Sequence, residues 1–274
     1  MRRAEYLNIP TIMVEKHHEA NSFGVLILHG FTGTLESVKA LYAPLQELGI
    51  TVSMPLLMGH GEDSPEALRM VRWHEWLSDA DCALQKLSCD NNRIIVIGHS
   101  MGSLLALNLA VKYPNKVDSL VLATPAIKLV SMLAPGRPMQ SFALLISKIF
   151  KNWELKPLFS DPQCASVISH YSWVPTSAII SFFELIKQTL PQLCHIKVPV
   201  LVLQCRRDST VLPESATILF NNIATELSEK SVFWLEHSDH QLFCDGERAK
   251  AVQVVLDYVS SRMYKSGLQA DADY

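Results

Sequence analysis

Short apolar segments alternate with amphipathic segments along this chain. The apolar segments are bounded by residues that break regular structure, and they are typical of strands covered on both faces. They are Phe23–Leu28, Thr51–Pro55, Arg93–Ile97, Ser119–Ala123, Val198–Gln204 and Ser231–Glu236. Between them, apolar residues recur three and four positions apart, as they do on surface helices. These segments are Ser37–Leu48, Trp73–Leu87, Ser103–Tyr113, Pro213–Ile223 and Glu247–Met263. The alternation predicts an α/β fold with a mostly parallel sheet and helices on both faces.

The alternation stops between the fourth and fifth predicted strands. There, helical periodicity over Gln140–Trp153 and Thr176–Leu190 is mixed with several prolines. We interpret residues 125–196 as a small helical cap inserted into a core formed by residues 1–124 and 197–274. A chain of 274 residues, 49% of them hydrophobic, is long enough to bury one large core together with such an insertion.

Composition and charge narrow the range of partners. The formal net charge is −3, and no run of like charges occurs, so neither nucleic acid nor an anionic membrane is an expected partner. The N-terminal residues lack the apolar segment of a secretory signal, and no stretch reaches the roughly 18 apolar residues of a membrane span. We therefore expect a cytoplasmic protein that acts on a small molecule, and the pattern leaves its oligomeric state open.

The six cysteines are scattered and form no C-x-x-C pair. This spacing argues against a zinc site and against a disulfide framework. We expect mostly buried thiols, and we expect the protein to need neither a metal nor an organic cofactor.

One five-residue motif carries candidate chemistry. Gly98-His99-Ser100-Met101-Gly102 has the form G-x-S-x-G and lies between a predicted strand and a predicted helix. In that context the motif is typical of a sharp turn that holds its serine in a strained conformation, with nearly side-chain-free neighbours two positions away. The helix that follows directs free N–H groups at the same point. We predict that Ser100 is a nucleophile; the alternative is a purely structural turn.

A nucleophilic serine needs a base to take its proton and a carboxylate to orient that base. In this fold the expected chain order is serine, acid, histidine. Asp208 follows the fifth predicted strand and His240 follows the sixth. We prefer His240 to His237, because His237 lies at the strand exit. We prefer Asp208 to Asp239 and Asp245, because Asp239 is adjacent to the base and badly placed to face its ring.

A glycine-bearing turn, HGFTG at residues 29–33, follows the first predicted strand. Such a turn can bring a backbone N–H toward the nucleophile. We predict that the amides of Phe31 and Met101 form an oxyanion hole and that their side chains line the acyl pocket. The alternative is a turn with no catalytic part.

These motifs together resemble those of the α/β-hydrolase superfamily, and within it the carboxylesterase and monoacylglycerol lipase-like group of bacterial esterases. The resemblance covers nearly the whole chain outside the cap, and its motifs are HGFTGT (29–34), GHGED (59–63), GHSMG (98–102), the stretch 199–223, and the pair Ser238 and His240. It implies the α/β-hydrolase fold. It also implies a triad of Ser100, Asp208 and His240, with Phe31 and Met101 as donors to the oxyanion.

Two positions depart from that group, which usually has glycine where Ser103 and Asp239 stand. We expect the serine to be tolerated. The carboxylate of Asp239, beside the proposed base, predicts an altered loop or a favoured charged form of the base, and so raises the question of activity at neutral pH.

The function implied by the resemblance is hydrolysis of short- to medium-chain acyl esters or monoacylglycerols through an acyl-enzyme. Substrate choice is expected to depend on the cap. Transient contact with lipid by a cap helix at Gln140–Trp153 is one interpretation, and an ordinary exposed face with Lys148 and Lys151 is the alternative. The residues predicted to bind substrate are Phe31, Met101, Phe142, Leu145, Ile146, Ile179 and Phe183. The alternatives are another acyl hydrolase, such as a thioesterase or amidase, and a non-catalytic binding protein with a hydrolase fold.

Overall fold

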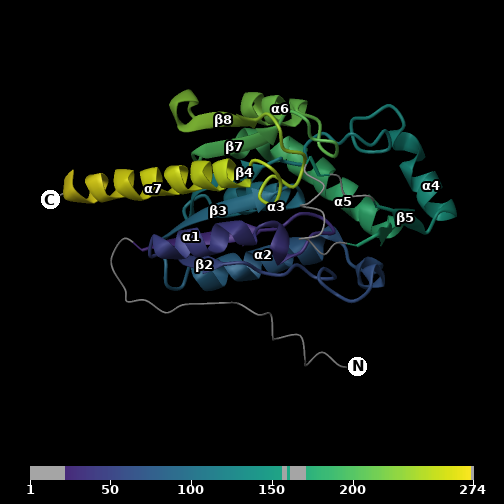
Figure 1. The fold of residues 1–274 in the computed structure, drawn as a ribbon, viewed down its shortest axis with the longest axis horizontal. Helices are drawn as coiled ribbons and strands as arrows, with labels where there is room; N and C mark the ends of the chain where they lie inside the picture. Colours follow the sequence, from purple (N-terminus) through teal and green to yellow (C-terminus); the bar gives the residue numbers. More distant parts are fainter. Residues whose placement is uncertain (1–21, 156–158, 161–170, 273–274) are drawn as a thin grey trace.

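The computed structural model describes residues 22–155, 159–160 and 171–272, and its centre is a six-stranded sheet (Figure 1). All neighbouring strands are parallel, in the order β2-β1-β3-β4-β7-β8. The strands are β1 (Phe23–Leu28), β2 (Thr51–Ser53), β3 (Arg93–His99), β4 (Val117–Ala123), β7 (Val200–Cys205) and β8 (Lys230–Leu235). The predicted parallel sheet and its six strands are confirmed, with small differences at the strand ends.

Helices cover both faces of the sheet. One face packs against α1 (Tyr42–Glu47) and α7 (Arg248–Ala272) through Val25, Ile27 and their neighbours. The other face packs against α2 (Trp73–Leu87), α3 (Met101–Lys112) and α6 (Glu214–Asn222). Helix α5 (Thr176–Thr189) extends the same apolar cluster by packing on α2 and α3. Because side chains alternate along a strand, a strand that is apolar at every position contributes to both layers.

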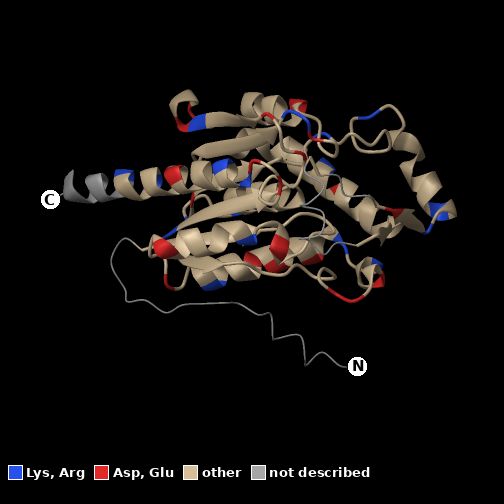
Figure 2. Cartoon of the chain, viewed as in Figure 1, with Lys and Arg blue, Asp and Glu red and all other residues tan. Residues whose placement is uncertain are grey.

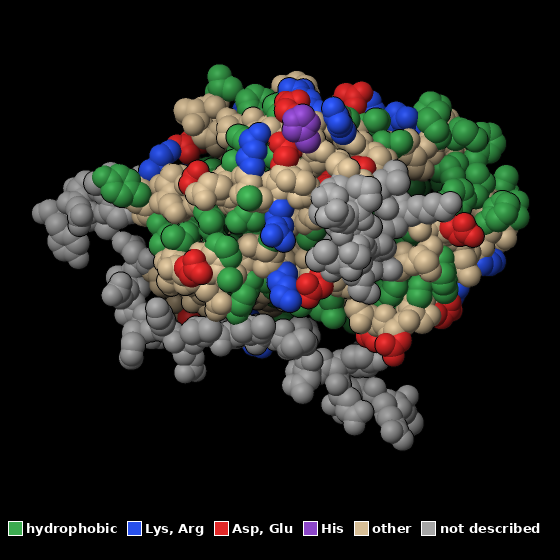
Figure 3. All heavy atoms as spheres, in the orientation of Figure 1, with side chains coloured by type: hydrophobic (Ala, Val, Ile, Leu, Met, Phe, Trp, Pro, Cys, Tyr) green, Lys and Arg blue, Asp and Glu red, His purple; other side chains and the backbone are tan. Residues whose placement is uncertain are grey.

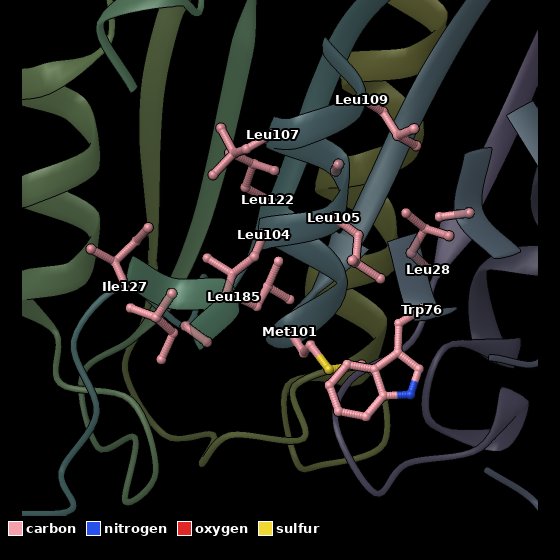
Figure 4. Packing of buried hydrophobic residues seen from close by; sticks show 14 of the residues in the cluster. Leu28, Trp76, Met101, Leu104, Leu105, Leu107, Leu109, Leu122, Ile127 and Leu185 are labelled. Carbon is pink, nitrogen blue, oxygen red and sulfur yellow. The ribbon is translucent and has the colours of Figure 1, made fainter. Parts of the chain in front are cut away.

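Helix α3 runs through the centre of the second layer. Every residue from 101 to 110 is buried, and Figure 4 shows its leucines in contact with strand and helix side chains on several sides. The buried polar side chain Asn108 is paired, because its Nδ2 donates to the carbonyl of Leu104 and to Thr189 Oγ1, both at 2.8 Å. This helix gives the residues at its N-terminus a rigid support.

Three predicted helical segments differ clearly from the structure. The helical prediction over Gln140–Trp153 is wrong at its end, because the α-helix covers only Ala143–Ile149 and Asn152–Glu154 is a strand. The segment predicted as one helix over Ser37–Leu48 consists of 3-10 turns at Leu35–Ser37 and Lys39–Leu41 followed by α1. The last helix continues past the predicted end at Met263 and reaches Ala272. Two further 3-10 turns lie at Pro65–Leu68 and Leu227–Glu229.

The chain between the adjacent strands β4 and β7 leaves the sheet and returns to it. It contains a 3-10 turn (Gln140–Phe142), α4 (Ala143–Ile149), β5 (Asn152–Glu154), β6 (Trp173–Pro175), α5 and a second 3-10 turn (Leu190–His195). β5 and β6 form an antiparallel pair, which the sequence pattern did not predict. In Figure 1, α4 and β5 lie at one end of the molecule and the C-terminal end of α7 lies at the other. Residues 156–158 and 161–170 of the predicted cap lie outside the described residues.

The expectation of mostly buried thiols is wrong for the cysteines that the structure describes. Cys82, Cys89 and Cys194 are exposed, Cys205 is buried and Cys244 is partly buried, because several of them lie on the outer faces of helices and turns. Cys164 lies outside the described residues. Figure 2 shows acidic and basic residues interspersed along the chain. Within the described ranges, no helix is long and apolar enough to span a membrane.

Candidate active site

Ser100 lies in a strained turn between β3 and α3. Its backbone angles, φ 53° and ψ −113°, fall in a region that L-residues with side chains rarely adopt. The flanking glycines allow this turn, because a Cβ on Gly98 would collide with the carbonyl of Gly102, and a Cβ on Gly102 would collide with the carbonyl of Leu28. The backbones of β1, β3 and α3 therefore meet at van der Waals distance around Ser100.

Replacement of Gly102 by alanine tests this packing. The new Cβ would lie 2.7 Å from the carbonyl carbon of Leu28, so backbone would have to move. We expect the free energy of unfolding to fall by about 3 kcal/mol, measured by urea denaturation. Gly246→Ala is the matched control, because a Cβ at that position would meet nothing within 4 Å. An equal loss in both variants would show that the close approach at Gly102 is not the cause.

The hydroxyl of Ser103 contacts two backbone carbonyls. Its Oγ donates to the carbonyl of Gly98 at 2.7 Å and lies 3.3 Å from the carbonyl of Ala123. The Ala123 carbonyl also accepts the backbone N–H of Ser100 at 2.9 Å. The hydroxyl of Ser103 thus joins β3 and β4 below the turn, as expected for a tolerated substitution.

The structure brings the predicted acid and base together. His240 Nδ1 donates to Asp208 Oδ2 at 2.9 Å, and both side chains are buried. The other carboxylate oxygen, Asp208 Oδ1, accepts the backbone N–H groups of Thr210 (2.9 Å) and Val211 (2.7 Å). A carboxylate held in this way fixes the orientation of the imidazole and leaves its Nε2 for another partner. Ser100 and His240 line one pocket, which we call the polar pocket.

The alternative base and acids lie elsewhere. His237 is exposed, and its backbone N–H donates to Glu247 Oε2 at 2.7 Å. Asp245 Oδ2 accepts the backbone N–H of Asp239 at 2.7 Å. The carboxylate of Asp239 accepts the backbone N–H of His240 and two groups of Ser209, so it contacts the backbone of the proposed base and not its ring.

The HGFTG turn packs directly against Ser100. A Cβ on Gly30 would lie 3.2 Å from Ser100 Cβ and 3.2 Å from His99 Nδ1, so a side chain there would crowd the candidate nucleophile. The backbone N–H of Gly33 donates to the carbonyl of Gly30 at 3.2 Å and closes the turn. Phe31 lines the polar pocket, and its ring stacks on Phe182 with centroids 5.0 Å apart.

Met101 differs from its predicted position in one respect. Its backbone begins α3 directly after Ser100, as expected. Its side chain is fully buried in the core near Trp76 (Figure 4) and is not among the described residues that line either pocket near Ser100. The expectation that the Met101 side chain lines the acyl pocket is therefore wrong, because the first turn of α3 directs it toward the helix layer.

Three buried histidines surround this region and are held neutral. Burial lowers the pKa of His29 from 6.5 to about 4, and burial lowers the pKa of His60 and His99 to about 3. His29 Nδ1 donates to the carbonyl of Gly30 at 2.9 Å, while its Nε2 accepts the backbone N–H of Leu57 at 3.1 Å. His99 Nε2 donates to the carbonyl of His240 at 3.0 Å. These rings support the site as neutral hydrogen-bonding groups.

A second, apolar pocket adjoins the polar pocket. The two share Phe31, Leu129, Leu155 and Phe182. All of its other described lining residues come from the chain between β4 and β7, and they are Ser131, Leu133, Ala143, Ile146, Ser147, Trp153, Thr176, Ile179, Ile180 and Phe183. The predicted residues Ile146, Ile179 and Phe183 lie there.

Phe142 and Leu145 do not line this pocket. Their exposed fractions are 51% and 56%. They lie three positions apart on the outer face of the turn and helix at residues 140–149, whereas Ala143 and Ile146 lie on the inner face. The prediction that Phe142 and Leu145 bind substrate is wrong in this structure.

The sequence reasoning missed several polar-pocket residues. Thr210 and Gln241 line the polar pocket, and each lies within two positions of the predicted acid or base. Their closeness in sequence to Asp208 and His240 could have identified them as pocket residues. Tyr171 also lines the pocket, and its hydroxyl donates to the carbonyl of Gly59 at 3.0 Å. No sequence pattern pointed to it. Among the residues that the structure describes, no group of three or more His, Cys, Asp or Glu side chains is arranged to hold a metal ion.

Comparison with known proteins gives a consistent family. Residues 21–247 match the family described as "Serine aminopeptidase, S33". The chain is 28% identical over 243 residues to a thermostable monoacylglycerol lipase of a Bacillus species, covering 88% of this chain and 91% of the relative. It is 28% identical over 236 residues to a carboxylesterase of Bacillus subtilis, covering 86% and 91%.

A solved structure shares the fold. It comes from a report on LipS and LipT, two metagenome-derived lipolytic enzymes, and matches with a TM-score of 0.79 and 24% identity, covering 88% of this chain and 94% of that one. The relatives of lipase and esterase type support ester hydrolysis as the reaction of this enzyme. The chain is thus a hydrolase with the α/β-hydrolase fold and belongs to the serine aminopeptidase S33 family.

Proposed function

We propose that this enzyme is a serine esterase that cleaves short- to medium-chain acyl esters or monoacylglycerols through an acyl-enzyme on Ser100. The observation that carries the proposal is the pair of joined pockets. One contains Ser100 and His240, and the other has a wall of aliphatic and aromatic side chains. A site of this form suits a substrate with a reactive carbonyl and an apolar acyl chain.

The proposed mechanism has two steps. His240, oriented by Asp208, takes the proton of the Ser100 hydroxyl as the serine oxygen attacks the ester carbonyl carbon. The backbone N–H groups of Phe31 and Met101 stabilise the oxyanion, and the alcohol leaves with the proton from His240. Water, deprotonated by His240, then attacks the acyl carbonyl carbon, and the carboxylic acid leaves as His240 returns the proton to the oxygen of Ser100.

We assign the described residues between positions 125 and 196 as a cap over the core, on the basis of their packing. Helix α5 lies on α2 and α3, where Ser181 Oγ accepts the backbone N–H of Trp73 at 2.7 Å. The inner face of α4 and the first half of α5 provide most of the apolar wall. The cap therefore packs on the core, and its inner wall determines which acyl chains fit.

The outer face of the cap is apolar as well. Figure 3 shows hydrophobic side chains gathered at the end of the molecule where Figure 1 places α4. The exposed residues there include Phe142, Leu144, Leu145, Ile149, Phe150 and Trp153, with Lys148 and Lys151 beside them. Such a face supports transient contact with lipid, from which an acylglycerol would be taken up.

The name of the family favours one other candidate, an aminopeptidase. An aminopeptidase must bind a free ammonium group, which normally requires a carboxylate in the pocket. Among the described residues that line the two pockets, none is Asp or Glu. The chemistry of this lining favours an acyl ester over a peptide N-terminus.

A chain-length series tests the proposal. We expect Ile179→Trp to lower kcat/KM for p-nitrophenyl octanoate by about tenfold or more, because filling the apolar pocket prevents burial of roughly two methylenes at about 0.8 kcal/mol each. Activity on p-nitrophenyl acetate should stay within about twofold of wild type, because acetate does not reach that pocket.

Leu145→Trp is the matched control, since this side chain lies on the outer face of α4 and should leave both substrates unaffected. Equal loss on acetate and octanoate in Ile179→Trp would contradict the pocket assignment. Turnover of aminoacyl p-nitroanilides with no turnover of esters would favour the peptidase.

A further inference from the structure

We propose that Asp239 is a positioning residue, which ties the loop carrying the base to the loop carrying the acid and so holds His240 against Asp208. The proposal rests on the proposed function, because it concerns how the acid and base of that site are aligned.

This connection between the two loops consists of short hydrogen bonds that the carboxylate of Asp239 accepts. Asp239 Oδ1 accepts the backbone N–H of Ser209 at 2.8 Å, and the Ser209 hydroxyl lies 2.8 Å from Oδ1 and 2.9 Å from Oδ2. Asp239 Oδ1 also accepts the backbone N–H of His240 at 2.7 Å. One carboxylate therefore binds the residue after the acid and the residue that is the base.

The two contacts between the loops run side by side. Ser209 directly follows Asp208, and Asp239 directly precedes His240. The 2.9 Å bond between His240 Nδ1 and Asp208 Oδ2 is thus repeated one residue away by the bonds between Ser209 and Asp239. A second bridge so close in sequence restricts the relative movement of the two loops, which follow different strands, β7 and β8.

The backbone of His240 is held on both sides. Its N–H donates to Asp239, and its carbonyl accepts His99 Nε2 at 3.0 Å. Asp239 is itself anchored, because its backbone N–H donates to Asp245 Oδ2 at 2.7 Å. With 7% of its surface exposed, Asp239 has exchanged most of its water for these donors, and bonds from N–H groups to a charged oxygen are stronger than neutral ones.

The loop that carries His240 also leads to a second carboxylate, Glu247, which serves as a control for Asp239. Glu247 Oε2 accepts the backbone N–H groups of His237 at 2.7 Å and Ser238 at 3.0 Å. The hydrogen bonds of this carboxylate thus stay within residues 236–250 and do not reach the acid loop. Loss of Glu247 should destabilise this loop, whereas loss of Asp239 should also misalign the acid and base.

The test compares Asp239→Ala, Asp239→Asn, Ser209→Ala and Glu247→Ala in the full-length enzyme, with a p-nitrophenyl ester as substrate. We expect Asp239→Ala to lower kcat by about 30- to 100-fold with KM nearly unchanged, because small misplacements of a catalytic group cost about that much. Asp239→Asn should recover kcat to within about threefold of wild type, because the amide oxygen still accepts both backbone N–H groups.

A double-mutant cycle separates positioning from general stabilisation. The effects of Asp239→Ala and Ser209→Ala on kcat should be non-additive, because the two residues share one bridge. The effects of Glu247→Ala and Ser209→Ala should be additive. An unchanged kcat in Asp239→Ala, an asparagine variant as impaired as the alanine variant, or an additive cycle would each overturn the proposal. Ser100→Ala run in parallel identifies failure of the proposed function, because an active Ser100→Ala enzyme would contradict that function whatever the Asp239 variants do.

Discussion

Ser100→Ala will lower kcat for p-nitrophenyl ester hydrolysis by about 10⁴-fold or more, measured under single-turnover and steady-state conditions. Ser100 is the residue at the apex of the strained turn, and its pocket contains the His240 side chain that faces Asp208. Without a hydroxyl at this point no acyl-enzyme can form. Only the substrate binding and oxyanion donors would remain to give residual rate.

Ser103→Ala is the control for this prediction. Ser103 is also buried and lies three residues away, but its hydroxyl is committed to the carbonyls of Gly98 and Ala123. We expect Ser103→Ala to lose some stability and to keep kcat within about threefold of wild type. Substantial activity in Ser100→Ala, or comparable loss in both variants, would show that chemistry does not run through Ser100.

The free energy of unfolding will fall steeply as the pH drops from about 7 to about 5. In the folded protein the pKa of His29 is about 4 and those of His60 and His99 are about 3, whereas all three are near 6.5 in the unfolded chain. Below pH 6.5 the unfolded chain binds protons that the folded protein does not bind, so stability is lost as pH falls. Each histidine contributes a slope of up to about 1.4 kcal/mol per pH unit.

The hydrogen bonds explain why the neutral forms persist. A protonated His29 could no longer accept the backbone N–H of Leu57 at Nε2. A second charge on His60 would lie against His29, whose ring centroid is 4.9 Å away. Protonation of these histidines would therefore bury a charge, and in His29 it would also break the hydrogen bond from the backbone of Leu57.

Urea denaturation at several pH values measures this effect, and the His60→Gln variant assigns it. His60→Gln should flatten the dependence below pH 6.5, because it removes one titrating group. Ser103→Ala, which removes no titratable group, is the control and should keep the wild-type slope. A free energy of unfolding that stays constant between about pH 7 and pH 5 would contradict the assignment of buried, neutral histidines.

The parts of the site that follow from local sequence could be predicted. The turn at Ser100 depends on Gly98 and Gly102, two positions to either side, and on the strand and helix that flank them, so a short motif contains the necessary information. Asp208 and His240 could be paired because both follow parallel strands, and the carboxyl ends of such strands meet at one edge of a sheet.

The lining of the cap could not be predicted in the same way. Residues 142–150, FALLISKIF, are apolar at most positions, so periodicity does not distinguish the inner from the outer face of α4. Packing against α5 decides it, and that contact joins residues far apart in sequence. As a result the sequence pattern points to Phe142 and Leu145, which are exposed, and does not reveal Ala143, which lines the apolar pocket.

The role of Asp239 likewise depends on a contact that sequence does not show. Its adjacency to His240 suggested a charge that disturbs the base. In the structure its carboxylate binds Ser209, 30 residues away in the chain, and the backbone of His240. Whether a carboxylate beside a base disturbs or positions it is decided by the donors that surround it, and these come from another loop.

The measurement that tests the proposed chemistry most directly is the location of the acyl-enzyme. Wild-type enzyme should be mixed with excess p-nitrophenyl octanoate, quenched in acid during turnover, digested and examined by peptide mass spectrometry. We predict a pre-steady-state burst of p-nitrophenol and an octanoyl adduct on Ser100, in the peptide that contains GHSMG. An adduct on Ser103 or on any other residue would contradict a mechanism that runs through Ser100. So would steady hydrolysis, at the same rate in wild type and Ser100→Ala, with neither a burst nor an adduct.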